Sequence, residues 1–363
     1  MKNTIGQNVS LTLFGESHGG GIGAVIDGLA AGIDVDESFI EKQLDLRRPV
    51  GKISTPRVEK DNFKILSGVF EGKTTGTPIC IVIPNENTKS KDYGEIRFKM
   101  RPSHADFTAN EKYHGFEDYR GGGHFSGRIT AGLVAAGAIA IDTLKKKGII
   151  IGSHISRLGG ISDREFKNLE EDINALNQMQ FAVLNGEKAE EMQERIIKVR
   201  AQGDSVGGVI ETAVSGLPAG VGEPWFDSVE SMISHAIFSI PAVKGIEFGA
   251  GFSIAEMRGS EANDQFRSVG GKIITETNRN GGINGGITNG MPVIFRTAFK
   301  PTPTIAKEQN TVDIRDNSNT TLIAHGRHDP CIVHRARVVV DSVTAIVLLD
   351  LLSSRFGTDW MVN

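Results

Sequence analysis

The 363-residue sequence predicts an α+β fold in which a central helical layer lies between two antiparallel sheets, built from two related halves. Residues 21–32 and 208–220 share a strand pattern followed by the turn Gly-Leu-x-Ala-Gly. Residues 64–84 and 272–299 both read as β-hairpins, which favour antiparallel sheets. Together with the helices described next, these repeats predict a layered sandwich with pseudo-twofold character.

Each repeated turn leads into an amphipathic helix, and each half then has a longer apolar one. The first amphipathic helix is expected over 37–47, with Asp36 as its N-cap, and the second over 227–238. The long helices are expected over 126–147 and 338–352. The first of these is rich in Ala and Gly, which lets helices pack backbone to backbone, so we expect both long helices in the core.

The chain is expected to form a single domain over 1–363. Its internal halves span approximately 1–150 and 203–355. The segment between them, 160–202, is polar with a helical pattern, so we expect it to lie at the periphery.

Composition favours a globular protein of a reducing compartment. Hydrophobic residues make up 39% and charged residues 23%, and the net charge of −4 argues against a general nucleic-acid binder. The only cysteines, Cys80 and Cys331, offer no disulfide framework. We find neither a targeting segment nor a membrane-spanning apolar run, and therefore expect a cytoplasmic protein that contacts no membrane.

Three loops place arginine beside glycine, histidine or carboxylate. Residues 120–128 read Arg-Gly-Gly-Gly-His-Phe-Ser-Gly-Arg and run into the first long helix, where backbone N–H groups and a guanidinium suit an anion. Residues 101–106 read Arg-Pro-Ser-His-Ala-Asp, and residues 326–330 read Gly-Arg-His-Asp-Pro. We therefore predict one shared pocket for a phosphorylated ligand.

Each of these signals has a structural alternative. A lone histidine such as His18 is more often a hydrogen-bonded surface residue than a functional one. Arg47 and Arg48 end a predicted helix, where basic residues also offset the macrodipole. The nearby cations Lys52 and Arg57 favour a binding loop instead.

Other site types receive little support. The histidines and Asp106 lack the close helical spacing of a zinc hydrolase, so no metal site is expected. The glycines over 19–28 lack a full dinucleotide fingerprint, and we find neither a serine-hydrolase elbow nor a phosphate-binding P-loop.

Five motifs taken together resemble the chorismate synthase family, and the likeness runs from about residue 4 to about residue 352. They are Phe-Gly-Glu-Ser-His-Gly at 14–19, Asp-Leu-Arg-Arg-Pro at 45–49, Ile-Leu-Ser-Gly-Val-Phe-Glu-Gly-Lys-Thr-Thr-Gly-Thr-Pro at 65–78, Arg-Pro-Ser-His-Ala-Asp at 101–106 and Gly-Arg-His-Asp-Pro-Cys at 326–331. The resemblance implies a homotetramer with a β-α-β sandwich fold.

The same resemblance implies a carbon–oxygen lyase acting on phosphates. Its reaction is the 1,4-anti elimination of phosphate from 5-enolpyruvylshikimate 3-phosphate to give chorismate, the last step of the shikimate pathway to aromatic amino acids. The reaction requires reduced FMN but has no net redox change. NADPH as the source of electrons and an external flavin reductase both remain open.

Residue roles carry over by motif. His18 is implied as an acid or cation near the departing phosphate, His104 as a partner of the reduced flavin, and Asp329 as a group that helps to accept the substrate proton. The implied substrate clamps are Arg47, Arg48, Arg57, Arg101 and Arg128. The implied FMN contacts are His124, Phe125, Ser126, Pro241, Ala242, Gly285, Lys300, Pro301, Thr302, Pro303, Thr304 and Arg327.

Two departures from the family pattern stand out. The familiar Gly-Gly-Gly-Arg-Ser-Ser-Ala-Arg reads Gly-Gly-Gly-His-Phe-Ser-Gly-Arg here, so side-chain contacts of His124 and Phe125 with FMN are left open. Lys52-Ile53 stands where many relatives have a second arginine, which leaves NADPH contact there open. A metal-dependent phosphohydrolase and a non-catalytic anion-binding module are the alternatives from other classes.

Overall fold

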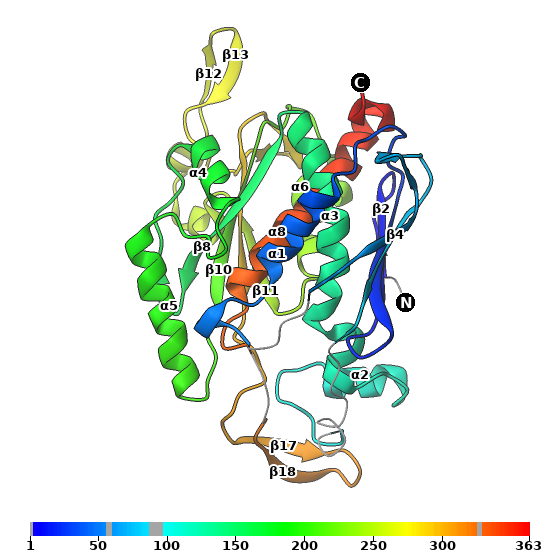
Figure 1. Cartoon of the computed structure of the whole chain (residues 1–363). Helices are drawn as coiled ribbons and strands as arrows, with labels where there is room; N and C mark the ends of the chain where they lie inside the picture. The colour runs from blue at the N-terminus through cyan, green and yellow to red at the C-terminus, as the bar shows by residue number, and fades with distance from the viewer. Residues whose placement is uncertain (1–2, 56–59, 87–96, 325–328) are drawn as a thin grey trace.

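The computed structural model describes residues 3–55, 60–86, 97–324 and 329–363, and Figure 1 shows helices enclosed between two sheets. The helical layer consists of α1 (Glu37–Arg47), α3 (Thr130–Lys146), α6 (Val229–Ile237) and α8 (Val333–Phe356). α3 packs on the first sheet, α8 packs on the second, and the two helices contact each other along their lengths. The predicted α+β sandwich with a central helical layer is confirmed.

The first sheet is antiparallel throughout, in the order β1-β2-β3-β7-β4. Its strands are β1 (Thr4–Ile5), β2 (Ser10–Gly15), β3 (Gly21–Asp27), β4 (Lys64–Ser67) and β7 (Ile79–Pro84). β4 pairs with β7, which confirms the hairpin predicted over 64–84. A small ribbon of β5 (Val69–Phe70) and β6 (Lys73–Thr74) lies between these two strands in the sequence.

The second sheet is also antiparallel, in the order β11-β16-β10-β8-β9. Its strands are β8 (Ile150–Leu158), β9 (Ile161–Ser162), β10 (Gly208–Ser215), β11 (Val243–Phe248) and β16 (Val293–Phe299). The hairpin predicted over 272–299 is wrong. β13 (Lys272–Thr275) pairs with β12 (Phe266–Val269), whereas β16 lies between β10 and β11.

The two repeated turns have the same backbone conformation. Gly28 and Gly32 follow β3 with φ of +87° and +94°, and Gly216 and Gly220 follow β10 with φ of +86° and +92°. These left-handed values strongly favour glycine. The repeat in the sequence therefore corresponds to the same turn after β3 in the first sheet and after β10 in the second sheet.

Glycines let α3 approach its neighbours closely. A Cβ on Gly132 would lie 2.8 Å from the carbonyl carbon of Gly23 in β3, and one on Gly137 would lie 2.3 Å from Cβ of Ser342 in α8. Residues 127–146 are long and apolar enough to cross a membrane, contrary to the prediction that no such run exists, but 83% of an 18-residue stretch within them is buried inside the protein. This segment is a core helix of the sandwich.

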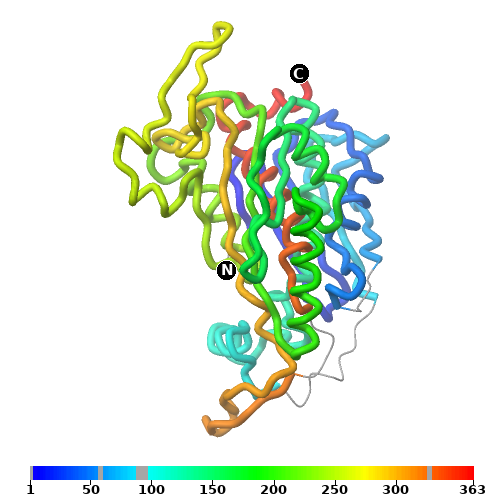
Figure 2. Tube along the Cα trace, turned by 90° about the vertical axis from the view of Figure 1, so that its left-hand side faces the viewer, coloured from blue at the N-terminus to red at the C-terminus, as the bar shows by residue number. Residues whose placement is uncertain are grey.

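Shorter elements surround the sandwich. α4 (Leu169–Leu176) and α5 (Gly186–Ala201) lie at its side, as expected for the polar segment 160–202. Figure 2 shows the β12–β13 hairpin and the ribbon of β17 (Gln309–Asp313) and β18 (Ser318–Leu322) projecting from opposite ends. The other short α-helices and strands of the described residues are α2 (Asp106–Tyr113), α7 (Gly259–Ala262), β14 (Ile283–Asn284) and β15 (Ile287–Thr288).

Buried polar contacts link α8 to the first sheet and strengthen the second sheet internally. Asp350 in α8 accepts hydrogen bonds from the backbone N–H groups of Gln7, Asn8 and Val9 at 3.1, 2.6 and 3.0 Å. His154 in β8 lies between the carboxylates of Asp163 at 2.8 Å and Glu211 at 3.0 Å. Burial opposes the charged imidazole, but these two hydrogen bonds outweigh it and raise the pKa of His154 above 6.5.

Candidate active site

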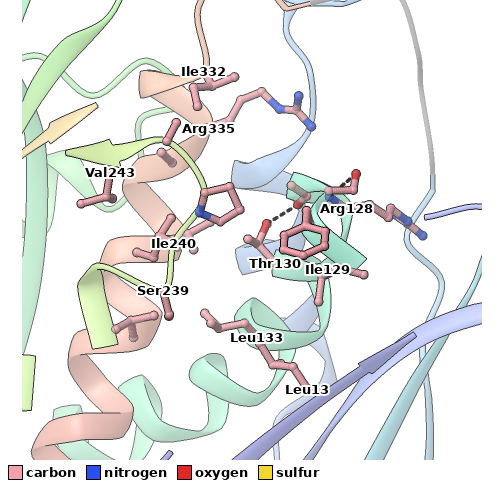
Figure 3. A pocket seen from close by; sticks show the side chains of 18 of the residues that line it. Leu13, Arg128, Ile129, Thr130, Leu133, Ser239, Ile240, Val243, Ile332 and Arg335 are labelled. Carbon is pink, nitrogen blue, oxygen red and sulfur yellow. Dashed lines mark hydrogen bonds between the residues drawn. The ribbon is translucent and has the colours of Figure 1, made fainter. Parts of the chain in front are cut away.

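A large cavity opens between the two sheets, where α3 and α8 begin. Its volume is about 890 Å³, toward the upper end of the range of roughly 300–1,000 Å³ that is typical of ligand sites. Figure 3 shows Arg128 and Arg335 toward one end and Leu13 and Leu133 toward the other. The cavity thus joins a cationic end to an apolar wall.

The glycine-rich loop before α3 forms part of the cavity wall. Gly121, Gly122 and Gly123 have φ values of +60°, +86° and +53°. A Cβ on Gly121 would lie 2.2 Å from Cε1 of His18, so only glycine fits beside this imidazole. The loop therefore presents backbone to the cavity while His18 packs directly behind it.

His18 itself is buried and is not among the residues that line the cavity. Its Nδ1 atom lies 2.8 Å from the hydroxyl of Ser17, which in turn donates to the carbonyl oxygens of Arg120 and Gly121. His18 thus packs against Gly121, which itself lines the cavity.

The end of the glycine-rich loop is anchored by side chains. His124 donates from Nδ1 to the carbonyl oxygen of Gly15 at 2.7 Å, and the hydroxyl of Ser126 accepts the N–H of Arg128 at 3.2 Å. Phe125 remains 39% exposed, with its ring centroid 6.1 Å from that of Tyr113. An aromatic face is therefore available in the cavity wall.

His104 belongs to a group of three hydrogen-bonded side chains. Its Nδ1 atom lies 2.6 Å from Oδ1 of Asp106, and Arg101 donates to both oxygens of Asp106 at 2.7 Å. Burial opposes ionisation of Asp106, but the bonds to His104 and Arg101 outweigh it, so the pKa of Asp106 falls well below 3.8. Asp106 is therefore a carboxylate acceptor for Nδ1–H of His104, which leaves Nε2 for a ligand.

Asp329 also lines the cavity and is held by two contacts. Its Oδ1 accepts the backbone N–H of Thr55 at 2.8 Å, and its Oδ2 is paired with Nη1 of Arg335. Arg335 also donates from Nε to the carbonyl oxygen of Arg47 at 2.9 Å. This carboxylate thus has a fixed orientation where it meets the cavity.

Lys300 adds another cation to the wall. Its Nζ donates to the carbonyl oxygen of Ser103 at 2.5 Å. Burial, and then the charge of Lys244, lower the pKa of Lys300 below 10.5. Thr302 contributes a buried hydroxyl that has no partner among the described residues. These groups can receive an anionic or hydrogen-bonding ligand.

The structure brings most of the predicted site residues to this one cavity. Those that line it are Arg47, His104, His124, Phe125, Ser126, Arg128, Pro241, Ala242, Lys300, Thr302, Pro303, Thr304 and Asp329. His18, Arg48, Arg101, Pro301 and Gly285 are not among its lining residues. Arg57 and Arg327 lie outside the described residues.

The residues outside the cavity have identifiable surroundings. Arg101 forms an ion pair with Asp106, and Arg48 contacts Asp45 and the carbonyl oxygen of Lys60. Gly285 lies in the turn between β14 and β15.

Several lining residues were not predicted from the sequence. Asp61, Lys244, His235 and Arg335 all meet the cavity. Arg335 follows the Gly-Arg-His-Asp-Pro motif closely, which is the one signal that could have found it. Among the described residues, no group of three or more histidine, cysteine, aspartate or glutamate side chains could hold a metal ion.

Comparisons with known proteins agree over nearly the whole chain. The family model for chorismate synthase matches residues 9–353. The chorismate synthase of Aeropyrum pernix is 47% identical over 98% of this chain and 93% of its own length. The chorismate synthase of Pyrococcus abyssi is 47% identical over 96% of this chain and 97% of its own length.

The fold agrees as well. A crystal structure of chorismate synthase superposes with a TM-score of 0.77 and 31% identity, covering 98% of this chain and 94% of that one. Sequence and structure lead to the same conclusion: this chain belongs to the chorismate synthase family.

Proposed function

We propose that the chain converts 5-enolpyruvylshikimate 3-phosphate into chorismate and inorganic phosphate, with reduced FMN and substrate bound together in the large cavity. The observation that carries this proposal is the convergence of His104, Arg128 and Asp329, from distant parts of the sequence, on one cavity. Members of the family are lyases of aromatic amino-acid biosynthesis.

The residues present fit a flavin. Its ring system needs an apolar surface with polar edges, and its phosphate needs cations or hydrogen-bond donors. Phe125, Pro241 and Ala242 offer the apolar surface, and Lys300 with the unpartnered hydroxyl of Thr302 offers polar contacts. When bound, reduced flavin supplies an electron that weakens the allylic C–O bond and is then returned, so no net redox change occurs.

The chain's own residues bind and orient the substrate. Arg47 and Arg128 present guanidinium groups to the carboxylates and phosphate of the substrate. Phosphate leaves with the C–O bonding electrons, and His18, beside the glycine loop, acts as the cation or acid that supports its departure. Asp329 helps to take the proton lost from the substrate, and His104, held by Asp106, would contact the reduced flavin.

The origin of the reduced cofactor is also a proposal. Because the elimination has no net redox change, reduction of FMN is a separate step, and we assign it to a separate flavin reductase with NADPH as the electron donor. The free thiols of Cys80 and Cys331 suit a reducing compartment, which supports a cytoplasmic location.

We also propose a homotetramer. Trp225, Phe226 and Phe252 are 85%, 88% and 85% exposed, which is unusual for large apolar side chains. Contact between copies would cover them. Gly285 does not line the cavity of its own subunit, so a role at FMN requires a neighbouring copy to present it. Size-exclusion chromatography with light scattering measures the assembly directly.

Anaerobic incubation tests the proposed reaction. The protein is mixed with the enolpyruvyl substrate and chemically reduced FMN, and both chorismate absorbance and phosphate release are followed. We expect the two products in equal amounts and only with reduced flavin. Phosphate release without flavin that a chelator abolishes would indicate a metal-dependent phosphohydrolase, and binding without products would indicate an anion-binding module.

A further inference from the structure

Asp61 lies between two arginines of the cavity wall. Its Oδ2 atom is 3.5 Å from Nη1 of Arg47, and its Oδ1 atom contacts Nη1 of Arg128. The exposed fractions of the three side chains are 2% for Asp61, 7% for Arg47 and 6% for Arg128. One buried carboxylate therefore joins two guanidinium groups that come from different parts of the fold.

The other nitrogens of both arginines are also bound. Arg47 donates from Nε to the hydroxyl of Thr130 at 2.8 Å and from Nη2 to the carbonyl oxygen of Gly127 at 2.6 Å. With Asp61 on Nη1, all three nitrogens of this guanidinium have a partner, which fixes its plane.

Arg128 is held in the same way. Its Nε donates to Oδ1 of Asn85 at 3.0 Å, and its Nη2 donates to the carbonyl oxygen of Pro84 at 3.3 Å. Asp61 is a contact that the two arginines share.

The charge of Asp61 is needed for this arrangement. Two buried guanidinium groups that meet at one point repel each other, and leaving buried charges uncompensated is strongly unfavourable. A single carboxylate between them offsets part of that repulsion and holds one guanidinium group at each of its two oxygen atoms. The geometry thus fixes the orientation of two cations in the cavity wall.

We propose that Asp61 is a positioning residue that sets the orientation of Arg47 and Arg128 for the anionic groups of the substrate. This inference rests on the proposed function, because it takes the two arginines as the substrate clamps. Asp61 is not itself a catalytic residue, and it acts through the two guanidinium groups.

The main test is Asp61→Asn, which keeps the size of the side chain and removes its charge. Asparagine also tolerates the left-handed backbone at this position, where φ is +53°. We expect KM for the enolpyruvyl substrate to rise roughly 10- to 100-fold, the range for weakening charge-assisted contacts. We expect kcat to change much less and the Kd of FMN, from fluorescence quenching, to stay within about twofold of wild type.

The matched control is Asp34→Asn, which removes an exposed ion pair with Lys73 on the protein surface. It should leave KM, kcat and FMN affinity at wild-type values. A folded Asp61→Asn protein whose KM is unchanged or lower overturns the proposal, and a lower KM would mean that Asp61 competes with the substrate for the arginines.

A second variant covers the case in which Asp61→Asn does not fold. Asp61→Glu keeps the charge but lengthens the side chain by one methylene, which displaces both guanidinium groups. We expect a KM several-fold above wild type, and a KM equal to wild type overturns the proposal. Failure of the proposed function is distinguishable, because wild-type protein would then neither bind the substrate in calorimetry nor release chorismate.

Discussion

The close contact between α3 and α8 leads to a quantitative prediction for Gly137→Ala. An added Cβ would lie 2.3 Å from Cβ and 2.8 Å from Cα of Ser342. The Cα atom belongs to the backbone of α8 and cannot rotate away. The two core helices must therefore separate, or the new methyl group must remain compressed.

Two opposing effects set the size of the change. Alanine in place of glycine stabilises a helix interior by about 1 kcal/mol. Inserting a methyl group into a packed core costs about 1–3 kcal/mol, and backbone contact places this site at or above the top of that range. We therefore expect a net loss of about 2 kcal/mol in unfolding free energy, which is a large part of the roughly 5–15 kcal/mol of a typical protein.

Urea denaturation of the purified variant measures this loss. The control is Gly186→Ala at the start of α5, where no heavy atom lies within 4 Å of the added Cβ. That protein should be as stable as wild type or slightly more stable. If Gly137→Ala is equally stable, the reasoning about backbone contact between α3 and α8 is refuted.

Three further predictions concern named side chains. Because the pKa of His154 is raised, the stability that its charged form contributes is complete below pH 6.5 and is lost as the pH rises through the raised pKa. The urea midpoint of wild type should therefore fall over that pH interval, and the midpoint of His154→Gln should change less. Asp350→Ala leaves three backbone N–H groups without their acceptor and should lower unfolding free energy by about 2–4 kcal/mol in the same assay. His104→Ala and Asp329→Ala should lower chorismate formation far more than FMN affinity, and near-normal turnover would remove them from the mechanism.

Local signals in the sequence were sufficient for much of the fold. Asp36 accepts the N–H of Phe39 and caps α1 as predicted, because an N-cap depends on a few neighbouring residues. The hairpin over 272–299 failed because pairing of β16 is decided by distant strands. Residues 208–214 in β10 pair with β16, and no turn residues near β16 reveal that partner.

In the candidate site, too, features that depend on neighbouring residues could be predicted, and features that depend on distant residues could not. Motifs that combine glycine, arginine and histidine located most of the cavity wall, since such combinations are uncommon outside binding loops. Asp61 was missed because a single aspartate in a polar segment carries no signal, and its importance arises only when Arg47 and Arg128 meet it in space. Arg335 was missed because an arginine near a helix start has many structural explanations.

The position of α8 after the strands of both sheets in the sequence has a consequence for biosynthesis. This helix packs on the second sheet, supplies Arg335 to the cavity and holds residues 7–9 through Asp350. α8 is made after the strands of the second sheet, so the face of that sheet which α8 covers stays exposed during synthesis until α8 has folded onto it. A chain that stops before α8 therefore exposes apolar strands that favour aggregation, and the cavity is completed only when α8 is in place.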